Sequence, residues 1–319
     1  MDEFVAMKIN VKRMDAVRLH AHWILYFYEV VQAGSIRQAA RVLNVAPSAI
    51  SRQIKEIESI VGGPVFERAR KGLQLTGTGE VVAEHVTQVL RGLGRMQDTL
   101  DEQRGLRRGH VKVAAIQATA SELLPRTIAS FRKKYPRITF SCNFVGSNEV
   151  VEQVVAGDAD VGLSFNPPTL HTLHHLISVP LPFGAIMAPD AELAKRSTLR
   201  LHDLIDAQIP LILPDESIST RAIIDELLSK NALVIRPVIT TSHPEFIVGI
   251  AQHGAGIAFQ TPVGIERQLR DGSLVFVPLM EAGLKPPGLA VTVAAHRPPS
   301  PTASTFAEVV RAAVAELLK

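Results

Sequence analysis

Residues 35–76 have the sequence SIRQAARVLNVAPSAISRQIKEIESIVGGPVFERARKGLQLT, and this stretch decides the fold of the N-terminal part of the chain. Ser35 and Gln38 have the spacing of a capping box, in which each side chain satisfies a backbone N–H at the start of a helix. Pro47 suits the first position of a second helix, where its missing N–H has no bond to make. Two short helices joined by a turn predict a helix-turn-helix.

The second of these helices has one apolar and one polar face. Ile50, Ile54, Ile57 and Val61 recur at spacings of four, three and four residues, so they are expected to face the core. Ser48, Ser51, Arg52 and Lys55 lie on another face, as in a helix that enters the major groove of DNA. Ala46 precedes the helix, so no side chain is expected to cap it.

A basic β-wing is expected to follow, with strands at residues 65–68 and 73–76. Its basic residues are Arg68, Arg70 and Lys71. Residues 35–76 hold seven Lys/Arg and three Asp/Glu, an excess of four positive charges that favours a phosphate backbone. A charged run alone is more often a solvated surface, but its place in a helix-turn-helix with a wing favours DNA binding.

This stretch resembles the DNA-binding domain of LysR-type transcriptional regulators. The matching residues are Phe27, 33–35, Ala39, Ala40, Leu43, 48–54, Glu58, Pro64, 66–68, Leu75, Thr76 and Gly79. Ala46 departs from the family, which usually has Ser or Thr there. The resemblance implies sequence-specific binding to double-stranded DNA. The DNA-binding residues that we expect are Ser35, Gln38, Pro47, Ser48, Ser51, Arg52, Lys55, Arg68, Arg70 and Lys71.

A long helix is predicted at residues 78–104, between the DNA-binding domain (22–77) and a hinge (105–109). Its apolar residues follow a heptad pattern, which predicts a helix–helix dimer because the small domain offers them no evident surface of its own. The resemblance implies a homotetramer built as a dimer of dimers. The expected dimerisation residues are Val82, Val86, Val89, Leu93, Met96 and Leu100.

From residue 110 onward, strands alternate with helices, which predicts a parallel sheet. This part resembles the effector-binding domain of the same family, which is similar to a periplasmic binding protein. Lobe I is expected at 110–181 and 288–319, and lobe II at 182–287. Expected strands are 111–116, 138–144, 159–164, 185–188, 211–213, 234–239, 256–259 and 289–294; expected helices are 121–134, 147–156, 219–230, 244–253 and 302–318.

The predicted fold class is therefore α/β, with an N-terminal all-α winged helix-turn-helix domain and a C-terminal two-lobed, periplasmic-binding-protein-like α/β domain. Ligands of such sheets bind beyond the carboxyl ends of strands, against helix N-termini. Four polar loops at these places suit a carboxylate or another small anion, unless their Ser and Thr residues only cap helices. The expected effector-binding residues are Gln117, Thr119, Ser121, Ser147, Asn148, Thr220, Arg221 and Ser242.

The composition sets further limits. The chain has 319 residues, 46% hydrophobic and 20% charged, as in ordinary globular proteins. Residues 1–109 hold 16 Lys/Arg and 12 Asp/Glu, so the positive excess lies at the DNA-binding end. No apolar run is long enough to span a membrane, and we expect a cytoplasmic protein. Residues 1–21 form an extension, either a flexible arm or the product of a start codon upstream of Met7 or Met14.

Other functional classes have weaker support. The single Cys142 excludes an internal disulfide switch. His171, His174 and His175 lie in an expected loop and match no strong metal-ligand spacing. No catalytic motif is visible, so we expect no enzyme and no cofactor. A constitutive DNA-binding protein remains a second interpretation and an enzyme a third. RNA polymerase remains a further partner to consider besides DNA and the effector.

Overall fold

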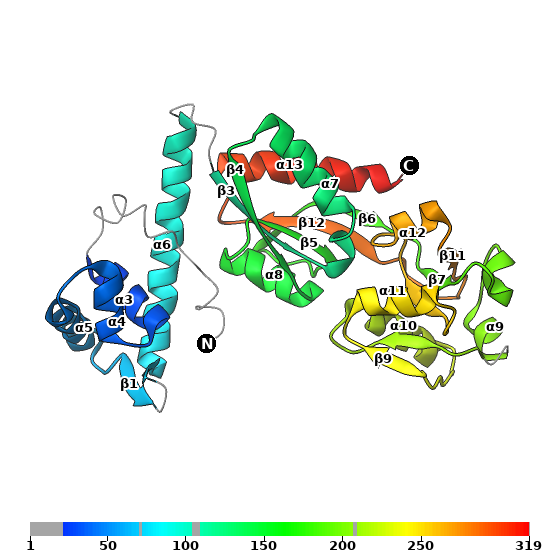
Figure 1. Ribbon diagram of the computed structural model, residues 1–319, viewed down its shortest axis with the longest axis horizontal. Coiled ribbons are helices and arrows are strands. Elements are labelled where there is room, and N and C mark those ends of the chain that lie inside the picture. Colours follow the sequence, from blue (N-terminus) through cyan, green and yellow to red (C-terminus); the bar gives the residue numbers. More distant parts are fainter. Residues whose placement is uncertain (1–21, 70–71, 104–108, 207–208, 319) are drawn as a thin grey trace. The chain divides into compact units, whose positions relative to one another are not determined.

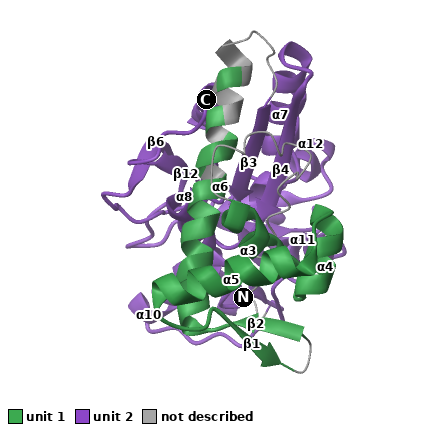
Figure 2. Cartoon of the chain, turned by 90° about the vertical axis from the view of Figure 1, so that its left-hand side faces the viewer, with its two compact units in different colours: residues 1–100 green, residues 101–319 purple. Residues whose placement is uncertain are grey.

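The computed structural model describes residues 22–69, 72–103, 109–206 and 209–318. The chain forms two compact units, residues 1–100 and residues 101–319 (Figure 2). The expected extension at 1–21, the wing residues Arg70 and Lys71, and most of the expected hinge lie outside the described residues.

The described part of the N-terminal unit contains three helices, a two-stranded antiparallel wing and most of a long helix (Figure 1). Ser35 directly precedes α4, but its side chain makes no capping hydrogen bond, so the predicted capping box is wrong. The helix begins instead with the backbone bond from Ala39 N–H to the Ser35 carbonyl, and Gln38 stays exposed. The elements are α3 (His22–Ala33), α4 (Ile36–Leu43), α5 (Pro47–Val61), β1 (Phe66–Ala69), β2 (Gly72–Leu75) and α6 (Gly77–Gln103).

A close backbone contact fixes the wing against the turn between α3 and α4. The Leu73 N–H donates to the Gly34 carbonyl at 2.8 Å. Gly72 has a φ of +112°, and a Cβ added there would lie 2.6 Å from the same carbonyl oxygen. Only glycine fits this position without a shift of the backbone, so the wing and the helix-turn-helix form one body.

The first half of α6 belongs to the core of this unit. Val82, Val86 and Leu93 are buried in one cluster with residues of α3, α4 and α5, and Val89 packs against it. The premise that the heptad residues lack a surface within their own domain is therefore wrong. At these positions the heptad pattern reflects packing against the three-helix core. The exposed residues of the pattern are Met96 and Leu100.

We therefore expect Leu93→Glu to destabilise the N-terminal unit by more than about 3 kcal/mol, because it places an unpaired charge in a dry core. Leu93 is 6% exposed, whereas Val81, which also lies on α6, is 69% exposed. Val81→Glu should change stability by less than about 0.5 kcal/mol. Urea unfolding followed by Trp23 fluorescence measures both. Equal stability of the two variants would contradict this packing.

The first lobe of the C-terminal unit is a five-stranded sheet in the order β4-β3-β5-β12-β6. Three strands are parallel as predicted, whereas β12 pairs antiparallel with both β5 and β6. In Figure 1, α7 and α13 lie on one side of the sheet and α8 on the other. The elements are β3 (Gly109–Ala115), α7 (Leu123–Lys134), β4 (Ile138–Phe144), α8 (Ser147–Ala156), β5 (Val161–Phe165), β6 (Leu173–Pro180), β12 (Gly288–Ala294) and α13 (Pro301–Ala315).

Two local predictions for this unit are wrong. His174 and His175 lie in β6 and not in a loop, because the segment pairs with β12. The expected strand at 234–239 forms only at its end, where β9 begins at Ile239. Pro237 has no N–H to donate to a neighbouring strand, and Val234 before it is 86% exposed.

The second lobe contains an antiparallel sheet in the order β10-β7-β11 and a parallel pair, β8-β9. Its helices surround these strands (Figure 1). The elements are β7 (Gly184–Met187), α9 (Leu201–Asp206), β8 (Ile212–Pro214), α10 (Ser219–Lys230), β9 (Ile239–Thr241), α11 (Pro244–Gln252), β10 (Ala258–Gln260), α12 (Glu266–Asp271) and β11 (Val275–Pro278).

The chain crosses between the lobes twice, and the two crossings are joined by hydrogen bonds. The Leu181 N–H donates to the Pro287 carbonyl at 2.9 Å. Gly288 and Asn166 exchange two bonds, one of them from the Gly288 N–H to Asn166 Oδ1 at 2.7 Å. The crossings therefore lie side by side at one edge of the first lobe.

Candidate functional site

The exposed face of α5 carries the polar residues that the sequence places at DNA. Ser48, Arg52 and Lys55 are exposed and Ser51 is half-buried, while Ile50, Ile54 and Ile57 are buried in one cluster with residues of α3 and α4. The expected inward position of Val61 is wrong, because Val61 is 40% exposed. Gln53 donates to Glu56 at 2.8 Å, which engages one acidic side chain of the helix. The face therefore offers hydroxyl and cationic groups to a ligand.

The N-terminus of α5 also suits an anion. Ala46 supplies no side-chain cap, and Pro47 occupies the first turn. The positive end of the helix dipole is thus uncovered, which favours phosphate oxygens there. Among the remaining expected residues, Ser35 is half-buried in the turn, and Gln38 and Arg68 are exposed.

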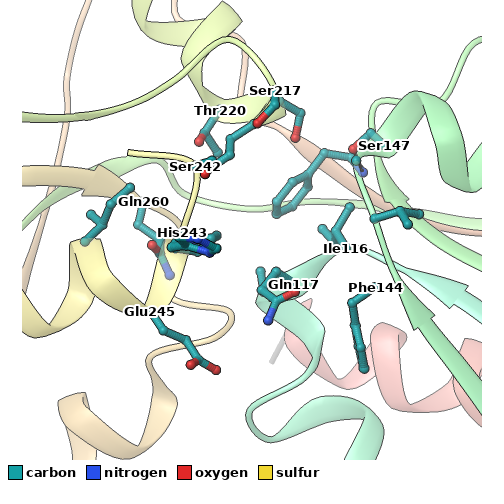
Figure 3. Close-up of a pocket in the computed structure, with 18 of the residues that line it drawn as sticks. Ile116, Gln117, Phe144, Ser147, Ser217, Thr220, Ser242, His243, Glu245 and Gln260 are labelled. Atoms are coloured by element: carbon teal, nitrogen blue, oxygen red, sulfur yellow. Dashed lines mark hydrogen bonds between the residues drawn. The ribbon is translucent and has the colours of Figure 1, made fainter. Parts of the chain in front are cut away.

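A cleft of about 1050 Å³ lies in the C-terminal unit and is lined by residues of both lobes (Figure 3). The structure brings together Gln117, Ser147, Thr220 and Ser242 from the expected set. Further polar residues line the cleft that were not among the expected ligand residues. Most of them also adjoin a strand end or a helix start, where ligands of open α/β sheets bind. These are Glu149, Ser217, Ser219, Thr241, His243, Glu245, Gln260 and Thr261.

Three helices begin at this cleft: α8 at Ser147, α10 at Ser219 and α11 at Pro244. None of the three has a side-chain cap, so their positive dipole ends are uncovered. The start of α11 offers fewer N–H groups than the other two, because Pro244 has none and the Phe246 N–H donates to the His243 carbonyl. No Lys or Arg is among the described lining residues, while Glu149 and Glu245 are. The described lining of the cleft therefore offers helix dipoles and hydrogen-bonding groups, and no cationic side chain.

The hydroxyl groups of the cleft differ in their freedom to bind a ligand. Ser147 is buried, and its Oγ accepts from the Phe165 N–H at 3.2 Å, which ties the start of α8 to β5. Thr220 is also buried, at the start of α10. Ser242 is exposed in the loop after β9. Among the expected hydroxyl residues that line this cleft, Ser242 is thus the exposed one.

Four expected ligand residues do not line this main cleft: Thr119, Ser121, Asn148 and Arg221. Thr119 is buried, and its hydroxyl donates to the Ile116 carbonyl at 2.9 Å, so it stabilises the turn that carries Gln117. Asn148 is exposed outside the lining. Ser121 lines a second, smaller cavity that adjoins the cleft.

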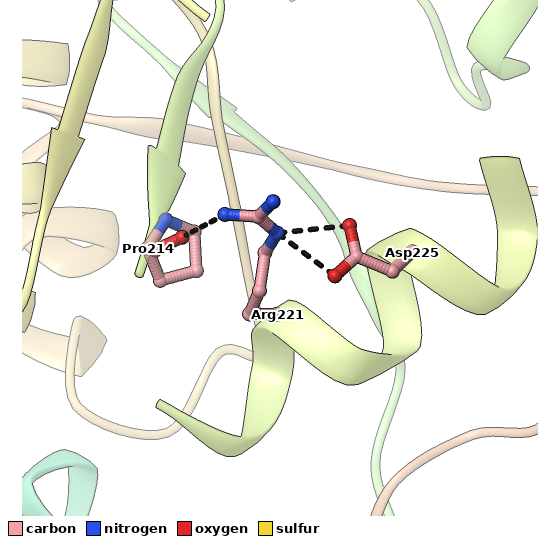
Figure 4. A network of polar contacts seen from close by, with 3 residues as sticks. All are labelled: Pro214, Arg221 and Asp225. Atoms are coloured by element: carbon pink, nitrogen blue, oxygen red, sulfur yellow. Dashed lines mark hydrogen bonds and ion pairs between the residues drawn. The ribbon is translucent and has the colours of Figure 1, made fainter. Parts of the chain in front are cut away.

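Arg221 is also absent from the lining, because its guanidinium is engaged elsewhere (Figure 4). Its Nε lies 2.8 Å and 3.0 Å from the two carboxylate oxygens of Asp225, one helical turn away. Its Nη1 donates to the Pro214 carbonyl at 3.0 Å. The structure therefore gives Arg221 a role in joining α10 to β8, in place of the expected contact with an anion.

The lobes also meet beside the cleft. Arg270 of α12 forms an ion pair with Glu122 across the lobes, at 2.7 Å. Glu266 accepts from the Gly264 N–H at 2.9 Å. Burial raises the pKa of the Glu266 carboxyl, and the negative charge of Glu122 adds to this rise. The ion pair between Arg270 and Glu122 holds the lobes together at one end of the cleft.

The described residues contain neither a metal cluster nor a membrane span. No group of three or more His, Cys, Asp or Glu side chains there is arranged to hold a metal ion. In the same residues, no helix is long and apolar enough to cross a membrane.

Comparison with protein families matches both parts of the chain. The model described as "Bacterial regulatory helix-turn-helix protein, lysR family" matches residues 21–80, and "LysR substrate binding domain" matches residues 104–315. The chain belongs to the LysR family. This LysR-type transcriptional regulator has the predicted fold class, which is confirmed.

Individual relatives of this LysR regulator are distant. A probable RuBisCO transcriptional regulator of Emiliania huxleyi is 26% identical over 79% of this chain and 82% of its own. The structure of full-length CbnR with its target DNA has a TM-score of 0.65 at 22% identity and covers 92% of this chain and 99% of its own. The effector-binding domain of QuiR with shikimate has a TM-score of 0.55 at 15% identity, covering 66% and 98%. These two structural likenesses show a shared fold.

We expect Thr119→Val to lower stability by about 1 kcal/mol, since it removes one buried hydrogen bond. Ligand affinity should not change, because Thr119 lines neither cavity. Ser121→Ala in the same turn is a control for stability, because Ser121 is exposed. Urea unfolding followed by circular dichroism tests the pair, and a Thr119→Val protein as stable as the parent would refute the assigned role.

Proposed function

We propose that this LysR-type regulator binds double-stranded DNA through α5 and the wing, and that a small carboxylate in the interlobe cleft controls it. The observation that carries the DNA part is the exposed face of Ser48, Arg52 and Lys55 beside an uncapped helix N-terminus. A helix of this kind lies in the major groove with its N-terminal residues at base edges. CbnR, which is similar in fold, has been crystallised in complex with its target DNA.

Arg52→Ala should weaken binding to the operator by about 1–3 kcal/mol if the guanidinium contacts a base edge. Arg132→Ala is the matched control, because Arg132 is an exposed arginine of α7 in the other unit. Gel-shift titration at fixed salt gives both affinities. An equal, small effect of the two substitutions would exclude a specific role for Arg52.

The ligand part of the proposal is supported by the three uncapped helix N-termini at the cleft. Because the described lining has no Lys or Arg, the cleft is suited to one carboxylate and less to a phosphate with several charges. QuiR is similar in fold, and its effector-binding domain is in a complex with shikimate, a carboxylic acid. A ligand that touches both lobes shifts the lobe arrangement by its differential affinity for the two states.

Ser242→Ala should weaken binding of a carboxylate ligand about three- to tenfold, because it removes one hydrogen-bond donor. Arg221→Gln should leave the affinity within about twofold, since the Arg221 guanidinium is bound to Asp225 and Pro214. Isothermal titration measures the affinities of both variants for carboxylates that were first selected by thermal shift. A large loss in Arg221→Gln and none in Ser242→Ala would reverse the assignment.

The same proposal includes self-association. Met96 and Leu100 of α6 remain exposed after the core of the unit is filled, so they are the apolar residues of the expected seam that are available to a second copy. A homodimer, a tetramer of two such dimers and a contact with RNA polymerase stay predictions. Ligand-dependent melting of the full chain would separate a regulated protein from a constitutive DNA-binding one.

A further inference from the structure

A second cavity of about 270 Å³ adjoins the main cleft. Gln117, Gln260 and Glu245 line both spaces, so these residues stand at the junction between two chambers. Figure 3 shows Gln117 and Glu245 on the opposite side of the cleft from Ser217 and Thr220. The small chamber is therefore a continuation of the cleft, away from the start of α10.

The lining of the small chamber is rich in uncharged amides. Gln252 and Gln268 join Gln117 and Gln260, and Ser121 adds a hydroxyl. Gln252 Nε2 donates to Ser273 at 2.9 Å, which leaves its amide oxygen as an acceptor. Amide and hydroxyl groups both donate and accept hydrogen bonds, so they match a ligand whose groups do the same.

The charge of the small chamber excludes a second anionic group. Its described lining contains the carboxylate of Glu245 and no Lys or Arg. An anion placed there would meet repulsion without a cation to offset it, whereas a ligand hydroxyl would donate to the carboxylate. The helix N-termini at Ser147 and Ser219 line only the main cleft, so the two chambers differ in the charge that they accept.

The small chamber also spans the two lobes. Gln117 and Ser121 come from the first lobe, and Gln252 and Gln268 come from the second. The lobes touch at its wall, where a Cβ added to Gly264 would lie 2.8 Å from the Ala118 carbonyl oxygen. A group bound in this chamber contacts both sides at the point where the lobes meet, so it favours the closed arrangement.

We infer that the effector is a hydroxylated carboxylic acid, with its carboxylate in the main cleft and its hydroxyl groups in the amide-lined chamber. This inference rests on the proposed function, which assigns the carboxylate end. Each hydroxyl that finds a partner adds a net contribution of one hydrogen bond, so two or more hydroxyls give roughly tenfold or greater gain in affinity.

The test compares acids that differ only in hydroxyl groups, by isothermal titration of the full chain. One pair is shikimate and cyclohex-1-ene-1-carboxylate, and the other is gluconate and hexanoate. In at least one pair the hydroxylated acid should bind at least about tenfold more tightly. Gln268→Leu should remove most of this difference in affinity. It should leave the affinity for the acid without hydroxyl groups within about twofold of the parent's. Gln153→Leu, which changes a glutamine of α8 outside both linings, should change neither.

Each outcome separates the inference from the proposal on which it rests. Equal binding of the two acids in both pairs would overturn the hydroxyl assignment and support the carboxylate site. Tenfold selectivity that persists in Gln268→Leu and in Ser121→Ala would overturn the placement in the small chamber. Binding of myo-inositol as tight as that of any acid would overturn the carboxylate site alone. No binding of any acid at about 10 mM would overturn both.

Discussion

The return of β12 into the first lobe's sheet is the constraint on which the ligand-binding unit depends. This strand lies between β5 and β6 and is antiparallel to both, so the second lobe is an insertion between strands of one sheet. The bond between Leu181 and Pro287 joins the two crossings, and the bonds between Gly288 and Asn166 tie the returning chain to the end of β5. The cleft exists because the lobes are joined at this place and meet again at Arg270 and Glu122.

Inside the cleft, backbone dipoles replace charged side chains. The starts of α8, α10 and α11 supply the positive potential, while Arg221 is held by Asp225 one turn along α10. Glu149 and Glu245 lie in the first turns of α8 and α11, where they stabilise the helices. In the proposed function they also limit how much negative charge a ligand brings.

Much of this organisation was predictable from sequence. Periodicity and turn residues placed 138–144 and 147–156 at the bounds that β4 and α8 have, because both segments are regular and have clear ends. The polar loops identified Gln117, Ser147, Thr220 and Ser242 for the cleft. The partner of Arg221 was not predictable in the same way, since a cation near a helix start pairs equally well with a ligand or with Asp225. The antiparallel direction of β12 depends on its pairing with a distant strand, since Leu289 pairs with Phe165, 124 residues earlier in the chain.

Because Leu93 is buried against the helices of the N-terminal unit, the family match and the hydrophobic core of this unit end at different residues. Similarity to the helix-turn-helix family ends at residue 80, yet the hydrophobic core continues along α6 through Val82, Val86, Leu90 and Leu93. A fragment cut where the similarity ends would expose the apolar surfaces of α3 and α5 that these residues cover. Such a fragment would aggregate or unfold, so the smallest autonomous DNA-binding piece of this protein extends about three and a half helical turns beyond its family signature.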